Sequence, residues 1–183
     1  MTILQKPAAP SNYTVGRASK AITHVVIHVE AGTEAGTQTW FANPKAHVSA
    51  HYSVGKDGQV YQHVAETNTA WHAGIPFPYT WNEPSKDPHN QMNPNAYTIG
   101  IEHEGFAADP WPDAQVQASA ALVANICGRY HIPIDRIHVV GHHEIYAGHD
   151  CPSTGCPIDK LVAAAQAMGA SPTVPAPPSP SAP

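Results

Sequence analysis

The segment that most constrains the fold is AITHVVIHV at residues 21–29, which is apolar and β-branched apart from its threonine and two histidines. Runs of this kind are typical of a strand that is buried on both faces of a sheet. Such a strand needs neighbouring strands to pair its backbone and helices to cover its faces. The run therefore predicts a central strand in a layered fold.

Other segments supply the neighbours that this strand needs. HYSVGKDGQVYQHV alternates on both sides of a Lys-Asp-Gly turn, which is a hairpin signal. Because helical patterns are interspersed among the strands, the predicted fold class is α/β, with a mixed central β-sheet flanked by helices. The expected elements are strands at 97–105 and 136–143, a hairpin at 51–64, and helices at about 33–43, 113–130 (with Asp113 as a candidate cap) and 157–168.

The composition of the C-terminus differs from that of the rest of the chain. Residues 171–183, SPTVPAPPSPSAP, contain no aromatic and no charged side chain. Such a segment cannot bury enough surface to offset its ordering entropy, so it is typical of an extended linker. We predict one domain over 1–170 and a linker at 171–183 that leads to a further domain; a frayed tail is the alternative.

Charge and hydropathy exclude several classes of partner. The net charge is −5 with histidine counted as neutral, so no basic surface indicates a nucleic-acid partner. No apolar run approaches the roughly 18 residues of a membrane span, and the first residues, MTILQKPAAPSNYTVGR, lack the apolar core of an export signal. The chain has 13 histidines, which favours a metal or acid–base site.

Two histidines are expected at neighbouring strand ends. His28 closes the first strand and His142 closes the late one, and functional groups of α/β sheets commonly lie where strands pass into loops. A thiolate or carboxylate from the following loop would complete a site with three metal ligands and one open position. His24 and His138 lie further down the same strands, and we expect them to make structural hydrogen bonds.

The three cysteines do not form a regular disulfide framework. Cys127 lies in an apolar helical pattern and is expected to be a core residue. Cys151 and Cys156 leave two interpretations open, a bridge across a short loop or a metal-binding role for Cys151. The loop at 74–95 is similarly open, since its aromatics could line a groove or pin the loop to the surface.

Five motifs together carry a resemblance that none of them carries alone. In this order, spanning residues 25 to 152, they resemble the zinc-dependent N-acetylmuramoyl-L-alanine amidases, which share a fold with phage amidase endolysins and peptidoglycan recognition proteins. The motifs are VVIHVEAGT (25–33), VSAHYSVGKDGQVYQHV (48–64), AWHAG (70–74), NAYTIGIEHEG (95–105) and GHHEIYAGHDCP (141–152).

The resemblance implies a zinc ion with three protein ligands. In this family they are the histidine closing the first strand, the histidine after Gly in the late strand, and a Cys or Asp directly before Pro. These positions are His28, His142 and Cys151. The implied cofactor is Zn²⁺, a metal that suits a His/His/Cys ligand set.

The resemblance also implies the groups that move protons and bind substrate. One branch of the family places a Tyr where this chain has Ala50, whereas the other uses the Glu of the I-G-I-E strand, which is Glu102 here. Glu104 is the rival base on the same strand face. His149 occupies the polar position two residues before the third ligand and is assigned to stabilising the oxyanion. The residues assigned to the substrate groove, each with a structural alternative, are His51, Trp71 and His72.

The implied function is hydrolysis of the amide between N-acetylmuramic acid and L-alanine in peptidoglycan. The linker favours an endolysin, a monomeric wall hydrolase tethered to a wall-binding domain, with residues 1–170 as its catalytic domain. Without an export signal, such an enzyme would stay in the host cytoplasm until a holin or lysis releases it. The alternatives are a cytosolic amidase that recycles soluble muropeptides and a module that binds peptidoglycan without cutting it.

Overall fold

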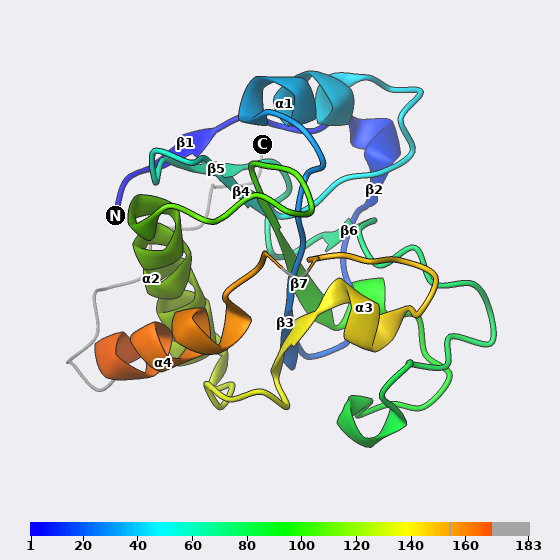
Figure 1. The fold of residues 1–183 in the computed structure, drawn as a ribbon. Coiled ribbons are helices and arrows are strands. Elements are labelled where there is room, and N and C mark those ends of the chain that lie inside the picture. Colours follow the sequence, from blue (N-terminus) through cyan, green and yellow to red (C-terminus); the bar gives the residue numbers. More distant parts are fainter. Residues whose placement is uncertain (154, 170–183) are drawn as a thin grey trace.

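The computed structural model describes residues 1–153 and 155–169, so the predicted linker at 171–183 lies outside the described residues. Its centre is a six-stranded sheet in the order β1-β5-β4-β7-β3-β8 (Figure 1). Within the described residues β4 and β5 pair antiparallel and the other neighbours pair parallel, which confirms the mixed sheet. The strands are β1 Ile3–Gln5, β3 His24–Ile27, β4 Tyr52–Val54, β5 Val60–Gln62, β7 Thr98–His103 and β8 Val139–Gly141.

Helices and loops cover the two faces of the sheet. Helices α2 (Asp113–Tyr130) and α4 (Ile158–Gly169) lie together over one face (Figure 1). There Val25 and Ile27 of β3 pack with apolar residues of both helices, while the intervening Val26 packs in a cluster on the opposite face. Helix α1 (Glu34–Ala42) buries Phe41 against a third, smaller cluster. The remaining elements are η1 (Pro10–Asn12), a two-stranded sheet of β2 (Tyr13–Thr14) and β6 (Thr69–Ala70), η2 (Pro84–Lys86), η3 (Pro94–Ala96) and α3 (His142–Ile145).

The predicted hairpin and helices are present, with one correction at a helix cap. β4 and β5 form the hairpin, and Gly58 in its turn has a φ of +82°, a conformation that other residues rarely adopt. Asp113 is the first residue of α2 rather than its cap, because Pro112 occupies the capping position and no side chain bonds the end of the helix there. Proline is compatible with a helix start because its φ is already suitable.

The late strand is shorter than predicted, and His142 lies outside it. β8 covers Val139–Gly141, because Asp135 accepts bonds from the backbone N–H groups of Ile137 and His138 and holds that stretch as a turn. At the other end Glu144 accepts a bond from the Gly141 N–H, which caps α3. His142 is therefore the first residue of α3.

The loop at 74–95 is pinned by an aromatic side chain. Trp81 is only 2% exposed, stacks on Tyr97 and donates a hydrogen bond to the Tyr97 hydroxyl at 3.1 Å. Trp81 therefore supports the interpretation that aromatic side chains attach the loop to the rest of the protein. Phe77, in the same loop, is exposed to solvent. No helix in the described part of the chain is long and apolar enough to cross a bilayer.

The expected structural residues have their predicted places. Cys127 is buried in the core between the sheet and α2. The His24 ring is buried and bonds the Thr23 hydroxyl, and the half-buried His138 ring bonds Asp135.

Candidate active site

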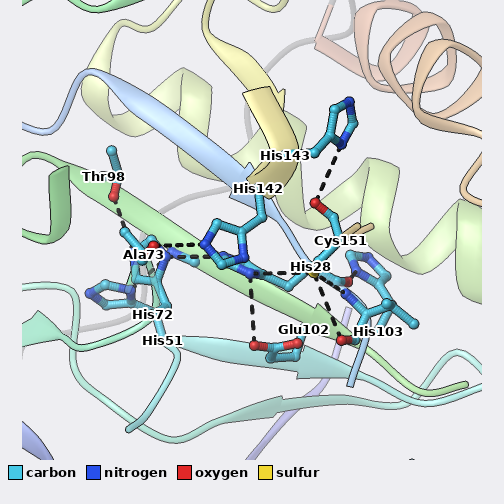
Figure 2. Close-up of polar contacts among 12 residues, drawn as sticks. His28, His51, His72, Ala73, Thr98, Glu102, His103, His142, His143 and Cys151 are labelled. Carbon is cyan, nitrogen blue, oxygen red and sulfur yellow. Dashed lines mark hydrogen bonds and ion pairs between the residues drawn. The ribbon is translucent and has the colours of Figure 1, made fainter. Parts of the chain in front are cut away.

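The register of three parallel strands brings the main site residues into one layer. Ile27 of β3 aligns with Ile101 of β7 on one side and with Gly141 of β8 on the other. The next residue along each chain segment is His28, Glu102 and His142, so these three lie side by side at the carboxyl edge of the sheet (Figure 2). The ring centroids of the two histidines are 4.5 Å apart.

Cys151 reaches this layer from the loop that follows α3. Its Sγ lies 3.8 Å from His28 Nδ1, and one ligand atom from each of His28, His142 and Cys151 lies within 4.8 Å of the other two. The backbone N–H of His143 donates to the Cys151 carbonyl at 2.6 Å and so holds the loop. The His143 ring contacts the same carbonyl through Nδ1 at 3.3 Å (Figure 2). Cys151 and Cys156 are both free thiols, so the structure contains no bridge between them.

These residues line a cavity of about 570 Å³, which we call the cleft. Trp71, His72 and His149 also line it. The His149 ring stacks on His142, with centroids 5.0 Å apart and planes 20° apart. The residues that line the cleft include His28, Glu30, Trp40, Trp71, His72, Glu102, His142, His149 and Cys151.

His51 does not face the cleft, contrary to its assignment to the substrate groove. Its ring has no exposed surface, and it accepts a bond from the Gly100 N–H at 3.1 Å. The buried Arg17 guanidinium fills the space beside it. His51 therefore has no surface to offer a substrate and approaches the site only through the edge of the His72 ring, whose centroid is 5.8 Å away.

Burial favours the neutral form of His28, His72 and His142. It lowers the pKa of His28 well below its usual value, and it lowers the pKa of His72 to about 3 and that of His142 to about 4. A neutral imidazole keeps one nitrogen lone pair, as a metal ligand requires. Burial, and then the Glu102 charge, raise the pKa of the Cys151 thiol to about 12.

A group of carboxyl side chains lies beside the ligands. Glu102 Oε1 is 4.0 Å from His28 Nδ1, and the Glu102 side chain is 15% exposed. Burial and then the charge of Glu34 raise the pKa of Glu102 to about 8. Burial, followed by Glu34, also raises the pKa of Glu30. Glu102 thus lies in surroundings that favour holding a proton, as a group that accepts and returns one should.

The charge of Glu34 gives a prediction for the variant Glu34→Gln. Glutamine keeps the oxygen that accepts bonds from Ser53 and Gln38 but removes the like charge that raises the pKa of Glu102. The pKa of Glu102 should fall, so the carboxylate form needed to accept a proton should persist to lower pH. We expect the acidic limb of the pH–rate profile to move to lower pH, and the Glu102 carboxyl signal in NMR titrations of metal-free protein to move likewise. An unchanged Glu102 titration would contradict this account.

Glu104, the alternative candidate for the base, bonds the backbone of the hairpin instead of facing the cleft. Its Oε2 accepts a hydrogen bond from the Lys56 backbone N–H at 2.8 Å, next to the hairpin turn, and it does not line the cleft. The geometry therefore favours Glu102 over Glu104 as the proton acceptor.

Sequence reasoning missed several residues of the cleft. Glu30, which lines the cleft, and Glu34, which is buried behind it at the start of α1, were not singled out, because their proximity to Glu102 depends on how the chain folds after β3. Trp40 lines the cleft from α1 with 52% of its surface exposed. The sequence alone does not show which aromatic of a helix will be exposed, so it offered no clear signal for Trp40.

The fold and the cleft define a mixed α/β protein with a candidate metal site and a carboxyl side chain at the edge of its sheet. The sequence profile of the N-acetylmuramoyl-L-alanine amidase family matches residues 18–154. The chain belongs to this family.

Two curated relatives extend the comparison. N-acetylmuramoyl-L-alanine amidase A of Achromobacter lyticus is 39% identical over an alignment of 155 positions, and the match covers 74% of this chain and 76% of that protein. The 1,6-anhydro-N-acetylmuramyl-L-alanine amidase AmpD of Enterobacter cloacae is 35% identical over 98 residues, which are 54% of this chain and 46% of that protein. The chain thus spans about half the length of the second relative.

Solved structures share the fold. A selenomethionine derivative of AmpD has a TM-score of 0.71 at 24% identity, covering 88% of this chain and 93% of that one. A mutant endolysin from Bacillus subtilis has a TM-score of 0.65 at 21% identity, covering 90% and 99%. The amidase AmiD from E. coli, in complex with its substrate anhydro-N-acetylmuramic acid-L-Ala-D-γ-Glu-L-Lys, has a TM-score of 0.66 at 28% identity, covering 80% and 59%.

Proposed function

We propose that the cleft hydrolyses the amide between N-acetylmuramic acid and L-alanine with a zinc ion held by His28, His142 and Cys151. The observation that carries the proposal is the convergence of these three donors within 4.8 Å of one another beside the Glu102 carboxyl. Three ligands leave a position open for a reacting group, which distinguishes a catalytic site from a closed structural one.

The donor set fits zinc. Two imidazole nitrogens and one thiol sulfur are ligands that zinc favours. The Nε2 atoms of both histidines are already engaged, His28 with His72 at 3.0 Å and His142 with the Ala73 carbonyl at 2.7 Å, so both Nδ1 atoms are free to bind. When bound, zinc supplies a Lewis acid that polarises a carbonyl and makes water more acidic.

The protein's own groups handle the protons. Glu102 accepts the proton of the attacking water and returns it to the departing nitrogen, a role typically worth 10²–10⁴-fold in rate. His149, stacked on His142 at the wall of the cleft, donates to the oxygen that becomes negative as the carbonyl is attacked. Trp71 and Trp40 provide apolar walls for the substrate.

The proposed substrate is the peptidoglycan polymer, cut as by an endolysin that reaches the wall when its host is lysed. The relative of which this chain covers 76% is named for the general N-acetylmuramoyl-L-alanine amidase activity, which supports a substrate beyond the anhydro form. The linker-like composition of residues 171–183 favours attachment to a wall-binding module. Recycling of soluble muropeptides is the second candidate, supported by the similarity to AmpD and AmiD.

Digestion of purified peptidoglycan, analysed by mass spectrometry with and without a chelator, tests the proposal. An amidase releases stem peptides with a free L-alanine amino end, and the chelator stops the release. New reducing sugars would show that the protein cuts a glycosidic bond and not the amide. Binding without any product would show that the chain recognises peptidoglycan but does not cut it. The two candidates are separated by comparing the rate on polymer with the rate on a soluble anhydromuropeptide.

A further inference from the structure

We propose that the dipeptide His72-Ala73, held by Asn95, is the positioning element that fixes which ring nitrogen of both His28 and His142 is free to bind the metal. Resemblance alone assigned His72 to substrate binding. The hydrogen bonds behind the cleft indicate that His72 orients a metal ligand instead. For each of these bonds the donor and the acceptor can be deduced.

The chain of bonds behind His28 starts at a carbonyl. The Pro94 carbonyl can only accept, so the Thr98 hydroxyl donates to it at 2.8 Å. The Thr98 oxygen is then left to accept from His72 Nε2–H at 3.1 Å. The His72 ring is buried and its Nε2–H is used on Thr98, so the neutral ring presents a lone pair on Nδ1.

That lone pair sets the state of the first ligand. His72 Nδ1 accepts from His28 Nε2–H at 3.0 Å, which leaves His28 Nδ1 without a proton and facing Cys151 (Figure 2). Hydrogen bonds to the far nitrogen are the usual means by which proteins choose the binding nitrogen of a histidine ligand.

The neighbouring residue does the same for the second ligand. The Ala73 carbonyl accepts from His142 Nε2–H at 2.7 Å, so the Nδ1 of His142 also lacks a proton (Figure 2). The two ligands lie on different elements, β8–α3 and the end of β3, and the dipeptide contacts both. One short segment therefore orients two ligands.

The dipeptide itself is held by a buried amide. Asn95 Oδ1 accepts from the N–H of His72 at 3.1 Å and from the N–H of Ala73 at 2.8 Å. Asn95 is 9% exposed. Gly100 of β7 makes room for the ring, because a Cβ there would lie 2.5 Å from His72 Cγ. The His72 side chain is thus fixed from its backbone, its far nitrogen and its flat face.

The first test determines which ring nitrogen of each histidine carries the proton in the metal-free protein. It uses NMR spectra that correlate the histidine ring nitrogens with the carbon-bound ring protons. Wild-type His28 and His142 should both show a single form protonated at Nε2. In His72→Ala, His28 should become a mixture of both forms while His142 stays single. A His28 that keeps the single Nε2–H form in His72→Ala would overturn the proposal. This result does not depend on whether the chain proves to be a zinc amidase.

The second test measures zinc affinity by competition with a chromophoric chelator. We expect His72→Ala to weaken binding about 10–100-fold. His72→Asn should restore most of it, because the asparagine oxygen is as many bonds from Cα as His72 Nδ1 is. His72→Gln should not restore zinc affinity, because the glutamine oxygen lies one bond further from Cα, at the place of His72 Nε2, which faces Thr98 and not His28. Equal affinities for the Asn and Gln variants would overturn the assignment.

His24→Ala is the matched control for loss of a buried imidazole. His24 is the first residue of β3, the strand that leads into His28; it is 2% exposed and bonds Thr23 rather than a proposed ligand. It should lower thermal stability but leave zinc affinity unchanged. If it weakened zinc as much as His72→Ala, the effect of His72 would be general destabilisation and the proposal would fail. If the wild type bound no zinc, the proposed function would fail while the NMR result still stood.

Discussion

Replacing Cys151 by alanine is expected to abolish peptidoglycan hydrolysis and most zinc binding. Cys151 is the one sulfur donor of the site and brings its Sγ to within 3.8 Å of His28 Nδ1. Loss of a residue that merely supports a ligand typically costs 10–100-fold in metal affinity, so loss of the ligand should exceed about 100-fold. Metal analysis of the purified variant, together with release of stem peptides, measures both effects.

The same variant should also change the protons released on zinc binding. The pKa of the Cys151 thiol is raised to about 12, so at pH 7 the metal-free protein carries the thiol proton. Because zinc binds the thiolate, uptake should expel about one proton. Calorimetry in buffers of different ionisation enthalpy should detect that proton in the wild type and lose it in Cys151→Ala.

Cys156→Ala is the control, since Cys156 is also a free thiol of intermediate exposure but packs beside the core cluster. It should keep zinc, proton release and activity. A Cys151→Ala variant with wild-type zinc content would show that the three donors do not form the metal site.

The place of His28 and His142 at the edge of the sheet was predictable because the signals are local. A strand that ends in a histidine places that histidine at the sheet edge, and parallel strands bring their carboxyl ends together. His28 needed only this geometry, whereas Glu102 was assigned through the family resemblance. The pairing of Ile27 with Ile101 brings the two side chains together. His142 reached the same place by a different route, as the first residue of α3.

The surroundings of the ligands were not predictable, because they depend on backbone atoms and on packing between distant segments. No residue type signals that the Ala73 carbonyl will meet His142, since every residue has a carbonyl. The motif around His51 could not show that Arg17, far along the chain, would bury its ring. β1 was missed because three residues carry too little pattern, and its pairing with β5 alone makes it a strand.

The contrast between the predictable residues at the sheet edge and their unpredictable surroundings indicates how the site is organised. His28, His142 and the Glu102 carboxyl lie at the edge of a sheet whose register is fixed by buried apolar side chains on both faces, and Cys151 reaches them from the loop after α3. The groups that orient them come from the segment around β6 and η3, which contributes Ala73 and Asn95. A substitution in that segment should therefore change metal binding while leaving the sheet intact.

Glu102→Gln separates proton transfer from metal binding and should lower the hydrolysis rate by about 10²–10⁴-fold while zinc remains bound. Glutamine has nearly the same shape as glutamate but cannot accept the proton of the attacking water. The loss should appear in kcat rather than KM, because Glu102 acts on the reacting atoms and the walls of the cleft stay in place. Steady-state rates on a soluble muramoyl peptide, with zinc content measured on the same sample, test this.

Glu104→Gln is the matched control, because Glu104 lies on the same stretch of chain, two residues on, and bonds the Lys56 backbone instead of facing the cleft. Its rate should stay within a few-fold of the wild type. The reverse result, a wild-type rate for Glu102→Gln and an inactive Glu104→Gln, would show that Glu104 accepts the proton of the attacking water. Loss of zinc in Glu102→Gln would instead mean that Glu102, 4.0 Å from His28 Nδ1, holds the metal site together, and proton transfer would need another acceptor.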